Sequence, residues 1–351
     1  MIDLNNISEE QLLKTRLCDL PIAIEGTWLQ ECVNELYREL DAQGLMFHPE
    51  CYLADEWLTP EGETVIGIPF YLAHPTLTKL EHKMMLEAEG EGKSWCMQLL
   101  RHEAGHAFSY AYHLHQRPDW QKVFGSSEKE YGNTYKFKPY SKSYVRHLDG
   151  FYAQYHPDED FVETFAVWLT PDSHWSESYQ GWKALKKLQF VDGLMNEIKG
   201  KPPFKQRGRK LWNQKKLTIT LEKYYRRKKT LEQEEFPDFH DMQLNKIFKS
   251  LTAQEWLAFR KERRKNKSLI TAEGLIRKYS KNFLNTVDRC TGERKYMISD
   301  LLKNISLRAK QLNMIVVDDP TNSLMQLGVY VTSLMMNYVH TGWYRGKLKH
   351  T

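Results

Sequence analysis

Residues 101–106 read RHEAGH and contain the pattern HExxH. They lie in a segment, 94–115, that predicts a helix with Ser94 as its N-cap. His102 and His106 are four residues apart, so a helix projects both imidazoles from one face, one turn apart. Glu103 lies beside them, rotated by about 100° around the helix axis. The stretch therefore predicts a central helix that presents two imidazoles and one carboxylate.

Gly105 stands in the middle of this predicted helix. A glycine there costs the helix about 1 kcal/mol relative to alanine. Close approach of another backbone would account for it, because only glycine leaves room at that position. We therefore expect a second element to pack tightly against the helix at Gly105.

A second stretch, residues 156–166, reads HPDEDFVETFA. It predicts a helix over 157–169, capped by Asp158 and ended by the Thr170-Pro171 pair. Phe161 and Phe165 belong to the apolar stripe of this helix. Glu163 lies near the stripe, and a carboxylate buried there needs a partner. A metal ion would supply one.

The two stretches together predict a zinc site. Neutral imidazoles bind zinc at about 2.0–2.1 Å, and the four-residue spacing allows both to reach one ion. Ser109 and Tyr112 stand where an HExxHxxGxxH site needs glycine and histidine, so the third ligand comes from elsewhere. Glu163 is favoured for that position over His156 and Glu159.

Glu103 is the expected catalytic group. A metal ion brings the pKa of its bound water towards 7, and a neighbouring carboxylate can then accept the proton. The oxyanion of the reaction would need a donor, and a ligand histidine would need an orienting partner. The candidates for these supporting roles are Tyr144, Tyr155, His156 and Asp160, with Tyr140 and Tyr152 as further tyrosines.

The chain resembles a known family over residues 45–175. The similarity rests on YLADEW at 52–57, IPFYLAHP at 68–75, LRHEAGH at 100–106 and HPDEDFVETFA at 156–166. These stretches resemble the bacterial zinc-binding metallopeptidases of the gluzincin type. The resemblance implies a zincin-like fold, zinc held by His102, His106 and Glu163, Glu103 as the base, and a peptide or protein substrate. It names a chemistry and not a particular substrate.

The composition is that of an ordinary globular protein. The chain has 351 residues, of which 41% are hydrophobic and 27% charged. Five cysteines without a CxxC pair favour reduced thiols over disulfides or a thiolate metal site. The acidic start lacks a secretory pattern, and no apolar run reaches 18 residues. We expect a cytoplasmic protein without a membrane partner.

Charge divides the chain into two parts. Residues 201–351 hold 32 Lys and Arg against 14 Asp and Glu, whereas residues 1–200 hold 18 against 31. The favoured interpretation is that the two parts pair with each other or expose charged helix faces. The alternative is a nucleic-acid-associated protein, suggested by basic clusters at 205–210, 224–229 and 260–265. A metal-dependent amidase for small peptides or modified amino acids is a further alternative.

The remaining pattern predicts an α+β protein. Its first domain, 1–199, is expected to be a zincin-like metallopeptidase with a small mixed sheet and the active-site helix. Its second part, 200–351, is expected to be basic and mainly helical. Strands are expected at 49–57 and 64–72, with Pro69 marking an edge strand on which a peptide could pair. The other helices are expected at 26–43, 181–198, 217–235, 241–249, 252–265, 269–285, 295–312 and 322–340.

Overall fold

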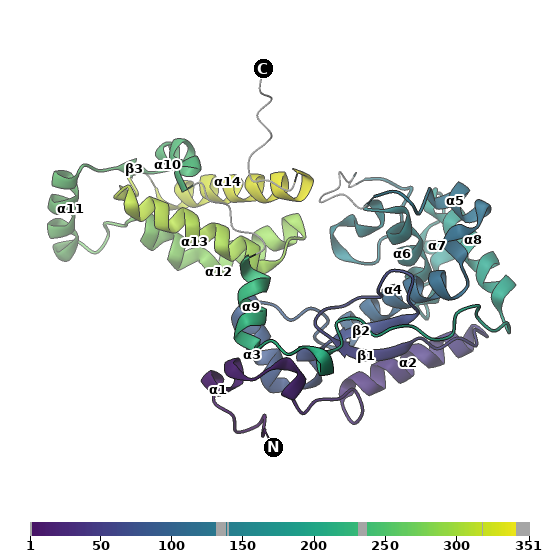
Figure 1. Ribbon diagram of the computed structural model, residues 1–351. Coiled ribbons are helices and arrows are strands. Elements are labelled where there is room, and N and C mark those ends of the chain that lie inside the picture. The colour runs from purple at the N-terminus through teal and green to yellow at the C-terminus, as the bar shows by residue number, and fades with distance from the viewer. Residues whose placement is uncertain (1, 131–137, 139, 231–236, 318, 342–351) are drawn as a thin grey trace. The chain divides into compact units, whose positions relative to one another are not determined.

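The computed structural model describes residues 2–130, 138, 140–230, 237–317 and 319–341. The chain forms two compact units, Met1–Lys229 (unit 1) and Thr230–Thr351 (unit 2) (Figure 1). The division thus lies between Lys229 and Thr230, later than the expected boundary at 199/200. The boundary is later because residues 200–229 pack on the part of the chain that precedes them and so belong to unit 1.

Unit 1 is mainly helical with one short strand pair. Its α-helices are α1 (Glu9–Lys14), α2 (Trp28–Ala42), α3 (Pro75–Met85), α4 (Lys93–Ala111), α5 (Pro118–Phe124), α6 (Pro157–Leu169), α7 (Trp175–Ser178), α8 (Ala184–Ile198) and α9 (Leu221–Thr230). Its strands are β1 (Glu50–Ala54) and β2 (Val65–Pro69), and a 3₁₀ helix, η4, covers Asp149–Gln154.

The strand pair differs from the mixed sheet that we expected. β1 and β2 run parallel, with Tyr52 opposite Gly67. Antiparallel neighbours are single bridges, Leu58 to Gly67 and Ala54 to Asn213. Gly67 both donates a hydrogen bond to Leu58 and accepts one from it. The chain itself therefore occupies the middle of the β2 edge, where we expected a peptide to pair.

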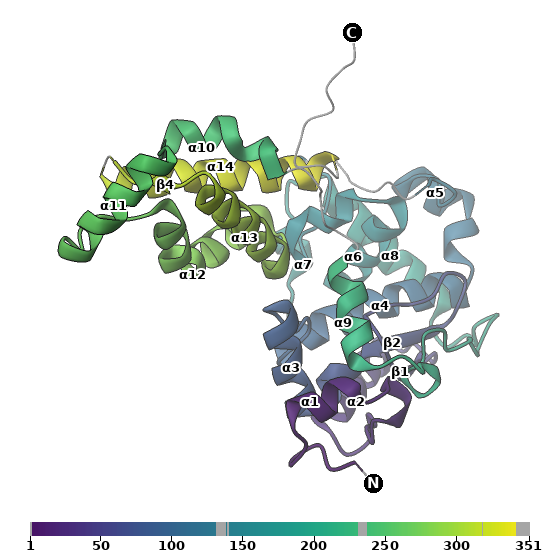
Figure 2. The same ribbon diagram turned by 60° about the vertical axis from the view of Figure 1, so that its left-hand side comes forward.

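Helix α4 is the centre of unit 1. It packs against α6 on one side and contacts β2 on another, and Figure 2 shows α4 between these two elements. A Cβ at Gly105 would lie 2.9 Å from Val162 Cβ and 3.0 Å from Val162 Cα, both on α6. The expected close approach at Gly105 is confirmed. It brings the HExxH face of α4 directly against the first two turns of α6.

The helix ends differ in detail from the expected caps. Helix α4 begins after Gly92 and not at Ser94. Helix α6 spans the predicted residues, but its N-cap is His156, whose Nδ1 accepts a hydrogen bond from Asp158 N. Pro157 follows at the first helical position, where its missing N–H costs nothing. Asp158 is therefore not the cap.

Residues 200–229 are held to the rest of unit 1 by backbone and side-chain bonds. Phe204 N donates to Ala111 O at the end of α4, and Tyr224 OH donates to Asp55 O. Glu63 forms ion pairs with Lys205 and Arg209, at 2.8 Å and 2.7 Å. Two of the three basic clusters, 205–210 and 224–229, thus belong to unit 1.

Unit 2 is a helical unit with a minimal strand pair. Its helices are α10 (Asp241–Ile247), α11 (Ala253–Lys265), α12 (Ala272–Thr291), α13 (Lys295–Gln311) and α14 (Pro320–Thr341). β3 (Lys249–Ser250) pairs antiparallel with β4 (Met314–Ile315). Helices α12, α13 and α14 contact one another and bury apolar side chains such as Ile276, Ile305 and Val331. None of the described helices has the length and apolar character needed to cross a membrane.

Candidate metal centre

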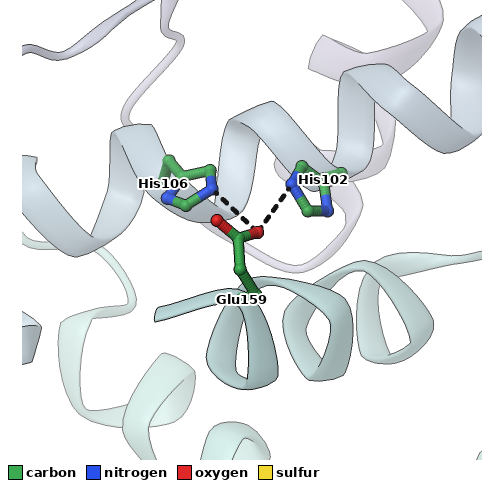
Figure 3. A group of neighbouring side chains, drawn as sticks. All are labelled: His102, His106 and Glu159. Carbon is green, nitrogen blue, oxygen red and sulfur yellow. Dashed lines mark ion pairs between the residues drawn. The ribbon is translucent and has the colours of Figure 1, made fainter. Parts of the chain in front are cut away.

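Two histidines of α4 and one glutamate of α6 meet in the interior of unit 1 (Figure 3). Glu159 Oε2 lies 3.2 Å from His102 Nε2 and 3.5 Å from His106 Nε2. One ligand atom from each residue lies within 4.8 Å of the other two. The side chains of His102 and Glu159 are each 5% exposed, and that of His106 is 12% exposed. These three atoms form a buried donor set that could hold a metal ion.

Glu163 does not join this set, contrary to the prediction from sequence. Its Oε1 lies 2.8 Å from His102 Nδ1, on the opposite side of the imidazole from Glu159. Its Oε2 accepts a hydrogen bond from Leu148 N at 2.9 Å. Both oxygens of Glu163 are therefore engaged away from the point where Glu159 meets the histidines. In the structure Glu163 therefore contacts the Nδ1 side of His102, and Glu159 is the glutamate that lies against the Nε2 atoms of both histidines.

The spacing on α6 explains how this exchange arises. Glu159 and Glu163 are four residues apart, so they lie one turn apart on the same helix face. Val162 packs on Gly105 and fixes how α6 is placed against α4. In this placement the first carboxylate reaches the Nε2 side of His102 and the second reaches the Nδ1 side.

The contacts of His102 decide its tautomer. A carboxylate only accepts hydrogen bonds, so the Nδ1 that faces Glu163 carries the proton. Nε2 of a neutral His102 is then a lone pair directed at Glu159. Two electron-rich atoms then face each other unless a proton or a metal ion lies between them. This is the arrangement of a ligand histidine held by a carboxylate behind it.

The pKa values of the two histidines also favour a positive charge at this position. Burial alone would lower the pKa of His102, but Glu159 and Glu163 raise it well above the usual value. Burial would likewise lower the pKa of His106, and Glu159 raises it. The site therefore stabilises positive charge at the Nε2 atoms. A divalent cation would supply that charge in place of protons, so the donor set fits a metal ion.

Glu103 lies beside the site and is not one of the three donors. Its side chain is buried, and its Oε2 has no hydrogen-bond partner among the described residues. Burial raises the pKa of Glu103, and the charges of His102 and His106 oppose the rise. A buried carboxyl group with an uncommitted oxygen can both accept and return a proton.

The candidates for supporting roles lie in three different places. His156 caps α6, and its Nε2 lies 2.6 Å from Lys129 O, so its ring is committed to the backbone. Asp160 pairs with Lys187 at 2.5 Å, and the ammonium of Lys187 lies 4.2 Å from the centre of the Tyr144 ring. Burial raises the pKa of Asp160 to about 7, although Lys187 opposes it. The structure does not bring Asp160, Tyr144 or His156 to the donor set.

Tyr152 of η4 packs against His102. Its ring centre is 5.6 Å from that of His102, and Tyr155 packs on it at 5.7 Å. Burial raises the pKa of Tyr152, and Glu159 and Glu103 raise it further, so its hydroxyl stays protonated. The sequence named Tyr152 only among several tyrosines, because nothing local distinguishes it from Tyr140, Tyr144 and Tyr155. Tyr140, another of them, is 92% exposed.

Comparisons of the chain with known protein families, with curated proteins and with solved structures find no match. The chemistry of the site therefore rests on its own residues and their geometry.

Proposed function

We propose that unit 1 is a zinc-dependent hydrolase that cleaves peptide amide bonds. One observation carries the proposal: Glu159 Oε2 lies between the Nε2 atoms of His102 and His106 in a buried position. Two imidazoles and a carboxylate leave one position open, as catalytic zinc sites do. The same donor types also suit iron, but a glutamate directly after the first histidine favours hydrolysis.

The bound metal would polarise the substrate carbonyl and lower the pKa of a water molecule to about 7. Residues of the chain would supply proton transfer, orientation of a histidine and a donor to the oxyanion. Glu103 accepts the proton of the attacking water and returns it to the leaving amine, a role that suits its raised pKa. Glu163 holds the Nδ1 proton of His102, so that Nε2 stays available as a ligand. Tyr152, whose ring packs against His102 and whose hydroxyl stays protonated, is a phenol that could donate to the developing oxyanion.

Burial of the site bears on the size of the substrate. His106 is the most exposed of the three donors, and only 12% of its side chain reaches solvent. A short or extended peptide, or an N-acyl amino acid, reaches such a site more readily than a folded protein does. The amidase alternative is therefore retained beside the peptidase. A comparison of folded proteins, short peptides and N-acyl amino acids as substrates separates the two.

The decisive experiment joins metal analysis with a single substitution. We expect the purified protein to hold about one zinc per chain and to hydrolyse quenched fluorescent peptides. Glu103→Gln should keep the zinc and lose about 10²–10⁴-fold in rate. The matched control is Glu177→Gln, an exposed glutamate of α7, which should change neither. Full hydrolysis by zinc-loaded Glu103→Gln would refute the mechanism, and a protein that neither holds nor responds to zinc would refute the site.

A further inference from the structure

Helix α11 of unit 2 has no buried residue. Figure 1 shows it apart from α12, α13 and α14 of the same unit. It begins with a capping box, in which Thr252 and Glu255 exchange hydrogen bonds with each other's backbone. A helix of this length is marginal by itself, so its caps matter more than its packing. The helix thus presents its side chains to solvent on every face.

The charges of α11 and the residues after it are concentrated and segregated. Residues 260–267 contain six Lys and Arg against one glutamate. Arg260 and Arg264 are four residues apart and share a face with Trp256 and Leu257 of the preceding turn. Glu255 and Glu262 are seven residues apart and lie together on the opposite face. One face of the helix is therefore cationic, with aromatic and apolar side chains at one end.

The arginines of this face have no acidic partner. Among the described residues, neither Arg260 nor Arg264 forms an ion pair, whereas Lys205, Arg209, Lys210 and Lys228 of unit 1 all do. Arg263 donates from Nε to Leu269 O, which holds its guanidinium at the end of the helix. A row of unpaired guanidinium groups suits phosphate, which each of them can bind with two hydrogen bonds.

Aromatic rings adjoin the arginines. Trp256 and Phe259 stack with ring centres 5.6 Å apart and planes 13° apart, and both are partly exposed. Leu257 is 59% exposed. Flat rings beside a cationic track are the combination that binds single strands, because any base can stack on them. A helix that inserts into a membrane surface needs an apolar centre to its face, and here arginines occupy the centre.

We propose that α11 binds single-stranded nucleic acid, with Arg260 and Arg264 contacting phosphates and Trp256 stacking on a base. The inference concerns unit 2 and is independent of the hydrolase proposed for unit 1. It assigns a partner to the one basic cluster, 260–265, that no acidic residue of the chain neutralises among the described residues.

The test uses the full chain and a fluorescein-labelled 20-nucleotide single strand of mixed sequence, with anisotropy measured from 0.05 to 0.3 M salt. Arg260→Ala/Arg264→Ala should weaken binding about 25-fold at 0.1 M salt, because each single-strand phosphate contact scales with about the 0.7 power of salt concentration. The matched control is Arg277→Ala/Lys281→Ala, an exposed pair with the same spacing on α12, which should change affinity less than about 3-fold. Trp256→Ala should weaken binding about 10-fold.

Four outcomes would overturn the proposal. They are no saturable binding at 0.05 M salt, an equal loss in the α12 control, a duplex that competes better than the single strand, and preferential binding to vesicles with about 30% phosphatidylserine. Circular dichroism of each variant shows whether helix content is retained. Arg260→Lys/Arg264→Lys keeps both charges, so this pair should retain most of the affinity even if the alanine pair loses structure.

Discussion

Units 1 and 2 differ in how deeply they bury their most enclosed ion pairs. In unit 1, Arg101 pairs with Glu39 while their side chains are only 10% and 6% exposed. Lys228 similarly meets Glu81, which is 2% exposed. In unit 2 the Arg308–Asp241 pair leaves 21% and 31% of its side chains exposed, and α11 buries nothing. Unit 1 therefore buries some of its ion pairs, whereas the ion pairs between described residues of unit 2 all stay partly exposed.

This difference changes the meaning of the charge asymmetry in the sequence. The basic residues between 201 and 229 do not form a tail, because Glu63, Glu50 and Glu81 of unit 1 accept them as partners. The interpretation that the two parts of the chain pair with each other is confirmed for this segment. The cluster at 260–265 on α11 differs from the clusters at 205–210 and 224–229, because no ion pair between described residues involves it.

The largest expected effect comes from removing a carboxylate from the candidate metal centre of unit 1. Glu159→Gln should weaken zinc binding by roughly 10²–10³-fold, since zinc gains on the order of 3–4 kcal/mol per ligand. Glu163→Gln should cost about 10-fold, because an amide oxygen can still accept from His102 Nδ1. Competition with a chromogenic chelator measures both affinities. The reverse order would restore Glu163 as the ligand.

The next effect concerns the buried pair between α2 and α4. Arg101→Met leaves the carboxylate of Glu39 buried without a partner, so it should destabilise unit 1 by about 3–5 kcal/mol. Urea unfolding in the presence of a chelator measures this without a contribution from bound metal. The double variant Glu39→Leu/Arg101→Met should recover most of the loss. A single variant as stable as the native chain would mean that buried charge matters little in unit 1.

A smaller effect depends on pH and on Glu63. Burial would raise the pKa of Glu63, but Lys205 and Arg209 lower it to about 2. A depressed carboxyl pKa adds stability above its unfolded value, near 4.5, and this stability is lost as pH falls towards 2. Glu63→Gln should remove on the order of 1–2 kcal/mol of that acid dependence, since both partners are partly exposed and screened. Glu50→Gln, at a carboxylate that is 64% exposed, should leave the profile unchanged.

The smallest effect is expected in unit 2. Lys303 pairs with Asp300 at 3.0 Å, but their side chains are 72% and 38% exposed. Lys303→Ala should change the free energy of unfolding by less than about 0.5 kcal/mol. Thermal unfolding of Lys303→Ala and Arg101→Met compares the loss of stability in the two units directly. A loss above about 2 kcal/mol from Lys303→Ala would remove the distinction between them.

Local pattern in the sequence determined most of the helices. Periodicity predicted α2, α6, α11 and α13 to within two residues at each end, because their apolar spacing and flanking polar residues are local signals. The parallel pairing of β1 with β2 was missed, since strand partners and direction depend on residues far away in the chain. The unit boundary was missed for the same reason. Helix α3 was also missed, although Pro75 at its first position is a local start signal.

The sequence by itself determined that His102 and His106 share a helix face with Glu103 beside them, because four-residue spacing fixes this in any α-helix. Spacing alone could not decide between Glu159 and Glu163, since the two lie on one face of α6. The tertiary structure decided it through the contact of Val162 with Gly105, which fixes how α6 lies against α4. That packing directs Glu159 to the Nε2 atoms and Glu163 to the Nδ1 proton behind them.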